Sequence, residues 1–418
     1  MTNQENKPGL WTRDFSIITI GTVVSMFGNA MSGFAMSLMV LDISKSTLLY
    51  AVYIAMYTIP QLITPLFSGA VLDRYSRKRT IYTLDFLSAG LYLIMAGVLA
   101  TGWFSFPVFA AYCFVLGTIE SIYMVAYESF YPLLITEGNF QKAYSIASTL
   151  ETTSAVMVPV SAFLYRKIGL APLLAANAVC FFAAAVMETQ IQAEEKYIEK
   201  QKSTELVGAT RLQQTLADVR EGFAYLRGEA GLLAVAVYFG VLAITGGVSA
   251  VVTLPYFKNT FANGEYIYMC VWGCALAGRA IGGGVHYKTV IPAEKRYSIA
   301  LAIYIFNALS EGFYLFFPVP AMMTLCFLMG LGGVTTYTIR VSATQSYVPD
   351  EKKGRFNGAF NMISTVGALL GELLAGLWSQ AIGERTILMI VMIACAASAL
   401  LIIGRGREAV MQVYNRTQ

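Results

Sequence analysis

Five glutamates lie within long apolar stretches of the sequence, where a charge is costly: Glu120, Glu128, Glu151, Glu311 and Glu372. Glu120 and Glu128 fall in one stretch, and Glu151 falls in the next. An ionised side chain at the centre of a membrane-spanning helix costs about 2.5 to 3.5 kcal/mol on insertion scales, so residues of this kind usually serve a function. Burial favours the protonated carboxyl group, and a nearby cation favours the ionised one. We therefore consider Glu120, Glu128 and Glu151 as candidates for proton coupling. The alternative is that they only hold helices together, as a Glu and an Arg that neutralise each other would do.

Polar and aromatic residues recur on single faces of four apolar stretches. With about 100° of rotation per residue, Tyr127 and Glu128 lie on the same side of a helix as Glu120. Such a face is unsuited to lipid and predicts an internal cavity. Its walls would be rich in Tyr, Phe and Met, which suit amphipathic or cationic organic molecules better than sugars or phosphates. The candidates for a substrate cavity are Asn29, Ser32, Met36, Tyr123, Tyr127, Tyr238, Thr245, Ser249, Tyr337 and Arg340.

The composition excludes most other classes of protein. Of 418 residues, 56% are hydrophobic and only 13% are charged, whereas about a quarter of the residues in a soluble domain are charged. All six cysteines lie in apolar stretches and predict no disulfide, and with a single histidine the sequence offers no set of metal ligands. We expect neither a cofactor nor a metal, no enzymatic centre and no binding of nucleic acid.

Hydropathy predicts an all-α polytopic membrane protein with 12 transmembrane helices, because each span needs about 20 mostly apolar residues. The single long polar stretch, residues 189–229, separates an N-terminal six-helix bundle at 1–188 from a C-terminal six-helix bundle at 230–418. The predicted spans lie near residues 15–41, 48–72, 80–101, 106–131, 141–164, 170–188, 230–256, 264–286, 297–317, 320–347, 356–381 and 386–404.

Polar landmarks recur between the halves at nearly one offset. Gly69 and Asp73 match Gly282 and His286 at 213 residues, residues 148–149 match 364–365 at 216, and residues 129–132 match 346–349 at 217. The pattern predicts two parallel six-helix repeats. In the eleventh span, small residues at 367, 371 and 375 predict a close contact with another helix.

The distribution of basic residues predicts the orientation. With both termini cytoplasmic, 22 of the 29 Lys and Arg residues fall in inner segments and 5 in outer ones; cytoplasmic loops are enriched in these residues. We expect a multi-pass protein of the cell (inner) membrane. The cytoplasmic linker at 189–229 contains apolar residues at 212, 216, 219, 223 and 226, which predict an amphipathic helix.

The loop after the second span reads GAVLDRYSRKR over residues 69–79. It resembles the signature loop of the major facilitator superfamily, G-x-x-x-D-R-x-x-R-[RK]. The resemblance implies that family's 12-helix fold, with spans one, four, seven and ten around a central cavity. It also implies a charged latch at the cytoplasmic helix ends, which pairs in one state and separates in another. The latch residues would be Gly69, Asp73, Arg74, Arg77, Lys78 and Asp85.

Further stretches are similar to bacterial drug:proton antiporters of the macrolide-efflux type, among them residues 131–134, 220–227 and 348–358. The resemblance implies a secondary active transporter with alternating access that exports amphipathic or lipophilic small molecules in exchange for protons. Uptake or siderophore export by the same fold, and lipid translocation, remain open as alternatives. We expect the partners to be a small-molecule substrate, protons and the lipid bilayer, and the protein to be a monomer.

Overall fold

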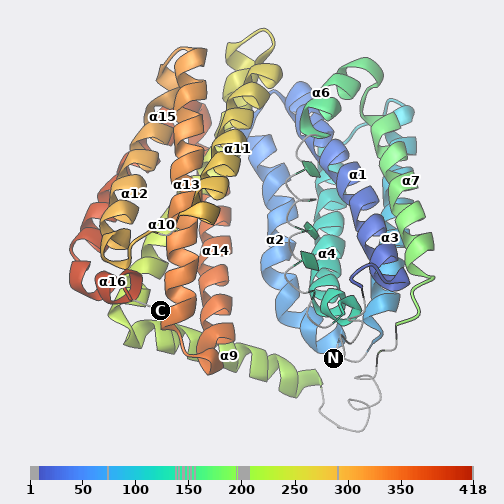
Figure 1. Cartoon of the computed structure of the whole chain (residues 1–418). Helices are drawn as coiled ribbons and strands as arrows, with labels where there is room; N and C mark the ends of the chain where they lie inside the picture. The colour runs from blue at the N-terminus through green and yellow to red at the C-terminus, as the bar shows by residue number, and fades with distance from the viewer. Residues whose placement is uncertain are drawn as a thin grey trace. The chain divides into compact units, whose positions relative to one another are not determined.

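The computed structural model describes residues 9–72, 75–136, 139, 142–143, 146–147, 150, 153–154, 157–193, 195, 208–289 and 291–416. Every regular element within those residues is helical (Figure 1). The chain forms two compact units. Unit 1 comprises Met1–Ile43 and Ile59–Gln213, and unit 2 comprises Ser44–Thr58 and Gln214–Gln418.

The helices of unit 1 begin and end at recognisable signals. Ser76 caps the N-terminus of α3 by accepting a hydrogen bond from the Arg79 amide, and a proline occupies the first turn of α4. Gly102 and Gly169, both at φ +77°, follow α3 and α6, in a backbone conformation that favours glycine. The helices that lie wholly or partly in this unit are α1 (Arg13–Ser44), α2 (Thr47–Leu72), α3 (Arg77–Ala100), α4 (Phe106–Phe130), the short η1 (Tyr131–Leu134), α6 (Met157–Ile168) and α7 (Leu170–Glu188).

Unit 2 has an apolar core built from several long helices. Tyr238 and Tyr304 lie at the centre of that core, with ring centroids 4.6 Å apart. Its elements are α9 (Gly208–Gly228), α10 (Ala230–Thr260), α11 (Gly264–Lys288), η2 (Ala293–Lys295), α12 (Arg296–Phe313), η3 (Tyr314–Phe316), α13 (Val319–Tyr347), α14 (Asp350–Ile382), α15 (Glu384–Ser398), η4 (Ala399–Gly404) and α16 (Arg407–Tyr414).

Within the described part of the chain, ten helices are long and apolar enough to cross a membrane. The prediction of an all-α, multi-pass membrane protein is thereby confirmed. The eighth predicted span is a helix, α11, but it is not among the ten; it includes Glu265, Arg279 and His286. The fifth predicted span, 141–164, is only partly described, and α6 covers its end from Met157.

Small residues bring α10 and α14 together in unit 2. A Cβ added at Gly371 would overlap the backbone carbonyl of Ile244, and Gly367 packs against Gly240 and Ala243. Ala375 is fully buried. The small-residue ridge predicted from the sequence therefore packs on α10.

The second half of α9 packs on the core of unit 2, as its apolar stripe requires. Leu226 is buried in that core, and Phe223 packs against it. Gly222 lies against the backbone of Arg355, whose guanidinium is 2.6 Å from the Glu221 carboxylate. Figure 1 shows α9 running crosswise to α13 and α14.

Candidate functional site

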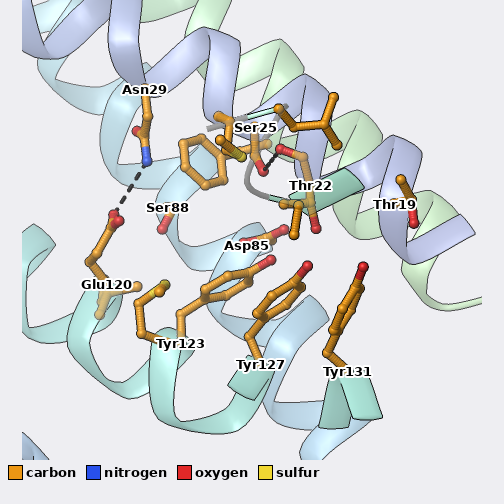
Figure 2. Close-up of a pocket in the computed structure, with 16 residues that line it drawn as sticks. Thr19, Thr22, Ser25, Asn29, Asp85, Ser88, Glu120, Tyr123, Tyr127 and Tyr131 are labelled. Atoms are coloured by element: carbon orange, nitrogen blue, oxygen red, sulfur yellow. Dashed lines mark hydrogen bonds between the residues drawn. The ribbon is translucent and has the colours of Figure 1, made fainter. Parts of the chain in front are cut away.

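Unit 1 encloses a cavity of about 510 Å³ (Figure 2). This volume is in the range of pockets for drug-sized molecules. Polar residues of α1 recur every three or four positions, so they share the face that forms one wall. The polar and acidic residues that line the cavity are Thr19, Thr22, Ser25, Asn29, Asp85, Ser88, Glu120, Tyr123, Tyr127 and Tyr131, and the apolar ones include Met26, Ile119, Met124 and Phe181.

A hydrogen-bond network orients Glu120 at one end of this cavity. The Asn29 amide donates to Glu120 Oε2 at 3.2 Å, and the Tyr92 hydroxyl donates to Asn29 Oδ1 at 3.0 Å. Behind them, the Asn177 amide donates to the Ser32 hydroxyl at 2.7 Å. Because the Asn29 amide both donates and accepts, its orientation is determined by its neighbours. The network therefore holds a carboxyl group in place against the cavity.

Two tyrosines of α4 and Tyr131 at the start of η1 form a row along another wall. The ring centroids of Tyr123 and Tyr127 are 5.9 Å apart, and those of Tyr127 and Tyr131 are 5.2 Å apart. The spacing of four residues places all three on one face of the helix. Figure 2 shows their hydroxyl groups pointing toward the side on which Asp85 and Thr22 lie. The row gives the cavity a wall that is aromatic along its length and polar at its edge.

Two glycines of α1 allow α7 to approach closely. A Cβ at Gly28 would overlap the side chain of Asn177, and one at Gly21 would lie 3.2 Å from Oε1 of Glu188. Asn177 and Glu188 are both fully buried. Since they are eleven residues apart, about three helical turns, they lie on the same face of α7. Sequence analysis missed both residues. Glu188 ends a predicted span and looked like the start of the polar linker, whereas Asn177 is a polar residue within a span and could have been noticed.

Asp85, predicted as a latch residue early in the third span, lies on the third turn of α3, is 1% exposed and lines the cavity. Eight residues after Arg77, the helix has risen about 12 Å from its start.

Four other candidates from the sequence are not among the described residues that line this cavity. Glu128 is exposed on α4 and does not line the cavity. Glu151 lies outside the described residues. Ser32 and Met36 are buried in α1 beyond the cavity lining. Of the three proton-coupling candidates, the cavity thus contains Glu120.

The described part of the latch is held within unit 1. Arg77 donates to the Ser129 carbonyl at 3.0 Å, and the ammonium group of Lys78 donates to the Ile191 carbonyl at 3.0 Å. The Glu195 carboxylate accepts hydrogen bonds from the Arg77 amide and the Ser76 hydroxyl. Gly69 lies in the last turn of α2, while Asp73 and Arg74 lie outside the described residues.

The residues of unit 2 that were predicted to line the substrate cavity lie in three different environments. Tyr238 and Thr245 are buried. Ser249 lines a second cavity of about 480 Å³ together with Arg279 and Glu311. Tyr337 is 55% exposed, and the Arg340 guanidinium carbon lies over the rings of Phe239, Phe360 and Tyr337, at 4.9, 4.8 and 5.5 Å from their centroids. Unit 2 does not gather these residues around one cavity.

Metal ligands do not cluster in the described residues. No three or more His, Cys, Asp and Glu side chains among them form a group that could hold a metal ion. The six cysteines are free thiols. The chemistry of the unit 1 cavity is therefore that of carboxyl groups, amides, hydroxyls and aromatic rings.

Comparison with known proteins gives results for both sequence and fold. The family model described as Major Facilitator Superfamily matches residues 18–372. The uncharacterized MFS-type transporter YkuC of Bacillus subtilis is 23% identical over 281 residues, which is 67% of this chain and 64% of YkuC. The chain thus matches just under two thirds of the length of that relative.

Solved structures show the same fold at low sequence identity. The crystal structure of a mutant of nucleoside transporter NupG superposes with a TM-score of 0.66 at 12% identity, covering 94% of this chain and 99% of that one. A second NupG structure gives a TM-score of 0.63 at 10% identity, covering 94% and 98%.

Proposed function

Because the chain belongs to the major facilitator superfamily, we propose that it is a proton-coupled transporter that exports amphipathic small molecules, organic cations among them. The coarser statement follows from the family: the chain is a multi-pass membrane protein, and its activity is secondary transport, not catalysis. The proposal adds the substrate class, the direction and the coupling ion.

One observation carries the substrate class. Among the described residues that line the unit 1 cavity are two acids, Asp85 and Glu120, and no Lys, Arg or His. A row of tyrosines and the methionines Met26 and Met124 supply the remaining surface. Aromatic faces and carboxylates attract cations, and methionine side chains adapt to varied shapes. A lipophilic cation would find both charge and apolar contact in this cavity.

Binding of tetraphenylphosphonium to the purified protein tests this proposal. Glu120→Gln keeps the shape and removes the charge, so we expect it to lower the affinity for this cation by about tenfold, which corresponds to about 1.4 kcal/mol. The affinity for triphenylphosphine oxide, which is similar in shape but neutral, should change much less. Glu408→Gln, at an exposed acid in α16, is the matched control. Equal losses for the cation and the neutral compound would refute the electrostatic argument.

Transport in vesicles tests direction and coupling. A pH gradient should drive accumulation of the cation against its own gradient, and Glu120→Gln, Glu128→Gln and Glu151→Gln examine the three predicted carriers in turn. Movement only down the substrate gradient would support facilitated uptake. Movement of labelled lipid without any dependence on pH would support lipid translocation.

A nucleoside is the second candidate substrate. The NupG structures, titled as a nucleoside transporter, share this fold, and the Asn29 amide beside the tyrosine row offers both hydrogen bonding and a stacking surface. Competition by uridine against tetraphenylphosphonium would detect it. Strong competition by uridine would favour nucleoside transport over cation export.

The latch stays part of the proposal. We expect the two states of the transporter to differ in the pairing of Asp73 with basic groups at the helix ends, and a pairing of this kind shifts populations only if it differs between states. Asp73→Asn should therefore reduce transport strongly and leave the amount of inserted protein unchanged. Normal transport by a well-expressed Asp73→Asn protein would exclude this role.

A further inference from the structure

Two buried acids from different helices lie next to the unit 1 cavity. Asp85 of α3 is 1% exposed and Glu188 of α7 is 0% exposed. The helices α3 and α7 pack against each other, which brings the two carboxyl groups close enough to interact electrostatically. Gly21 of α1 packs against the Glu188 carboxyl on the other side, at 3.2 Å from where its Cβ would be. The pair is therefore enclosed by α1, α3 and α7.

Three of the four carboxyl oxygens of this pair are buried and have no hydrogen-bond donor among the described residues. Among the described residues, no amide, hydroxyl or basic group donates to Oδ2 of Asp85 or to either oxygen of Glu188. Buried carboxylates in proteins are normally satisfied by several donors or by a cation. Two carboxyl groups in contact can satisfy each other only when one of them carries a proton and donates it.

The charged groups around the pair do not neutralise it. From α4, the Glu120 carboxylate adds negative charge and the Tyr123 side chain lies close by. From α3, Arg77 and Lys78 donate to the backbone carbonyls of Ser129 and Ile191. Asp14 of α1 accepts from the Gln192 amide, and Glu195 accepts from the start of α3. Apart from these two basic groups, whose side chains donate to backbone carbonyls, the described groups named here are acidic or neutral.

We propose that Asp85 and Glu188 together hold one proton, and that this pair is the proton-coupling site of the transporter, with Glu120 left as the counter-charge for substrate. The inference rests on the proposed proton-coupled transport. Asp85 lines the cavity, whereas Glu188 does not. A cation in the cavity stabilises the ionised form of Asp85 and displaces the proton, so the proton and the cation compete through this one residue.

Infrared spectroscopy of the purified full-length protein tests the shared proton directly. Near neutral pH we expect a carbonyl band of a protonated carboxylic acid that disappears at high pH. Glu188→Gln should remove this band, because the new amide donates to Asp85 and no proton is needed; Asp85→Asn should remove it likewise. Glu408→Gln and Glu120→Gln should retain it. Retention of the band in Glu188→Gln, or its loss in Glu120→Gln, would overturn the proposal.

Binding of tetraphenylphosphonium supplies the second readout. If one cation displaces one proton, the affinity rises with pH by up to about tenfold per pH unit, and Glu188→Gln flattens this dependence although Glu188 does not line the cavity. An unchanged slope in Glu188→Gln overturns the assignment. Loss of the acid band on replacing choline chloride by sodium chloride at constant pH also overturns it, since the pair then binds a metal cation.

The two readouts separate this inference from the proposed function. If tetraphenylphosphonium does not bind the parent protein, the substrate class is wrong, but the infrared band still decides whether the pair holds a proton. If the Asp85→Asn protein does not fold, the infrared spectra of Glu188→Gln and Gly21→Ala decide whether the pair holds a proton. Gly21→Ala keeps both acids and pushes on the Glu188 carboxyl, so it should shift the pH at which the band disappears; an unshifted midpoint in a folded Gly21→Ala protein counts against the assignment.

Discussion

Equivalent helices of the two units carry opposite chemistry. The match of residues 129–132 with 346–349, an offset of 217, pairs Tyr123 of α4 with Arg340 of α13, and Glu120 with Tyr337. In unit 1 these positions face a cavity, and Glu120 is oriented by the Asn29 amide. In unit 2 the corresponding cation lies over three aromatic rings. At these two pairs of positions, unit 1 therefore presents a carboxyl group and a tyrosine to a cavity, whereas unit 2 has a guanidinium group that packs on aromatic rings.

The glycines differ between the units in the same sense. Gly21 and Gly28 of α1 pack against the polar side chains of Glu188 and Asn177, whereas Gly371 of α14 packs against backbone of α10. A side chain can move aside, but a backbone carbonyl in a helix cannot do so without moving the helix. We infer that the two glycines of α1 position polar groups, and that Gly371 sets the spacing between α14 and α10.

The largest expected effect comes from breaking the helix contact of unit 2. Gly371→Ala places a methyl group on the Ile244 carbonyl, so we expect the free energy of unfolding to fall by about 1 to 3 kcal/mol, the usual range for overpacking. Gly246→Ala is the control, because nothing lies within 4 Å of its Cβ position; it should leave the melting temperature unchanged or raise it. Gly21→Ala in unit 1 should change stability less than Gly371→Ala. If Gly21→Ala is the more damaging of the two, the contrast between the units is wrong.

A smaller effect is expected from removing the cation of unit 2. Cation–π contacts contribute about 0.5 to 2 kcal/mol depending on desolvation, so Arg340→Ala should lower the free energy of unfolding by about 1 to 2 kcal/mol. The affinity for tetraphenylphosphonium should stay within twofold of the parent value. Arg340→Lys, which keeps a cation near the rings, should recover part of the stability. Thermal melting and cation binding of the same preparations separate the outcomes, and a loss of binding at an unchanged melting temperature would instead place Arg340 in a substrate site.

Hydropathy was sufficient to predict the helices, because burial in lipid requires a continuous apolar stretch that is visible in any sequence. Periodicity likewise predicted that Glu120, Tyr127 and Glu128 share a face of α4. The structure places Glu120 and Tyr127 on one cavity, whereas Glu128 is exposed and does not line it. Periodicity did not predict that Glu188 and Asn177 are buried. Their burial depends on Gly21 and Gly28 of a helix more than 140 residues earlier, and a contact between helices that distant has no periodic signal. Tyr238 shows a second limit of periodicity. A polar face that is predicted to line a cavity can instead pack into an aromatic core.

The smallest effect is expected from single hydroxyl groups, and it provides the closest comparison between the units. Tyr92 donates to Asn29 in unit 1 at 3.0 Å, and the hydroxyls of Tyr304 and Tyr414 share a hydrogen bond of 2.9 Å in unit 2. Changing either Tyr92 or Tyr304 to Phe keeps the ring and removes one hydrogen bond, which contributes about 0.5 to 1.5 kcal/mol to stability. We therefore expect Tyr92→Phe and Tyr304→Phe to lower the melting temperature by similar amounts.

Only Tyr92→Phe should also weaken tetraphenylphosphonium binding, by a few-fold, because it releases the Asn29 amide that orients Glu120. Equal effects of the two variants on binding would show that the cavity depends on general stability and not on the network at Asn29.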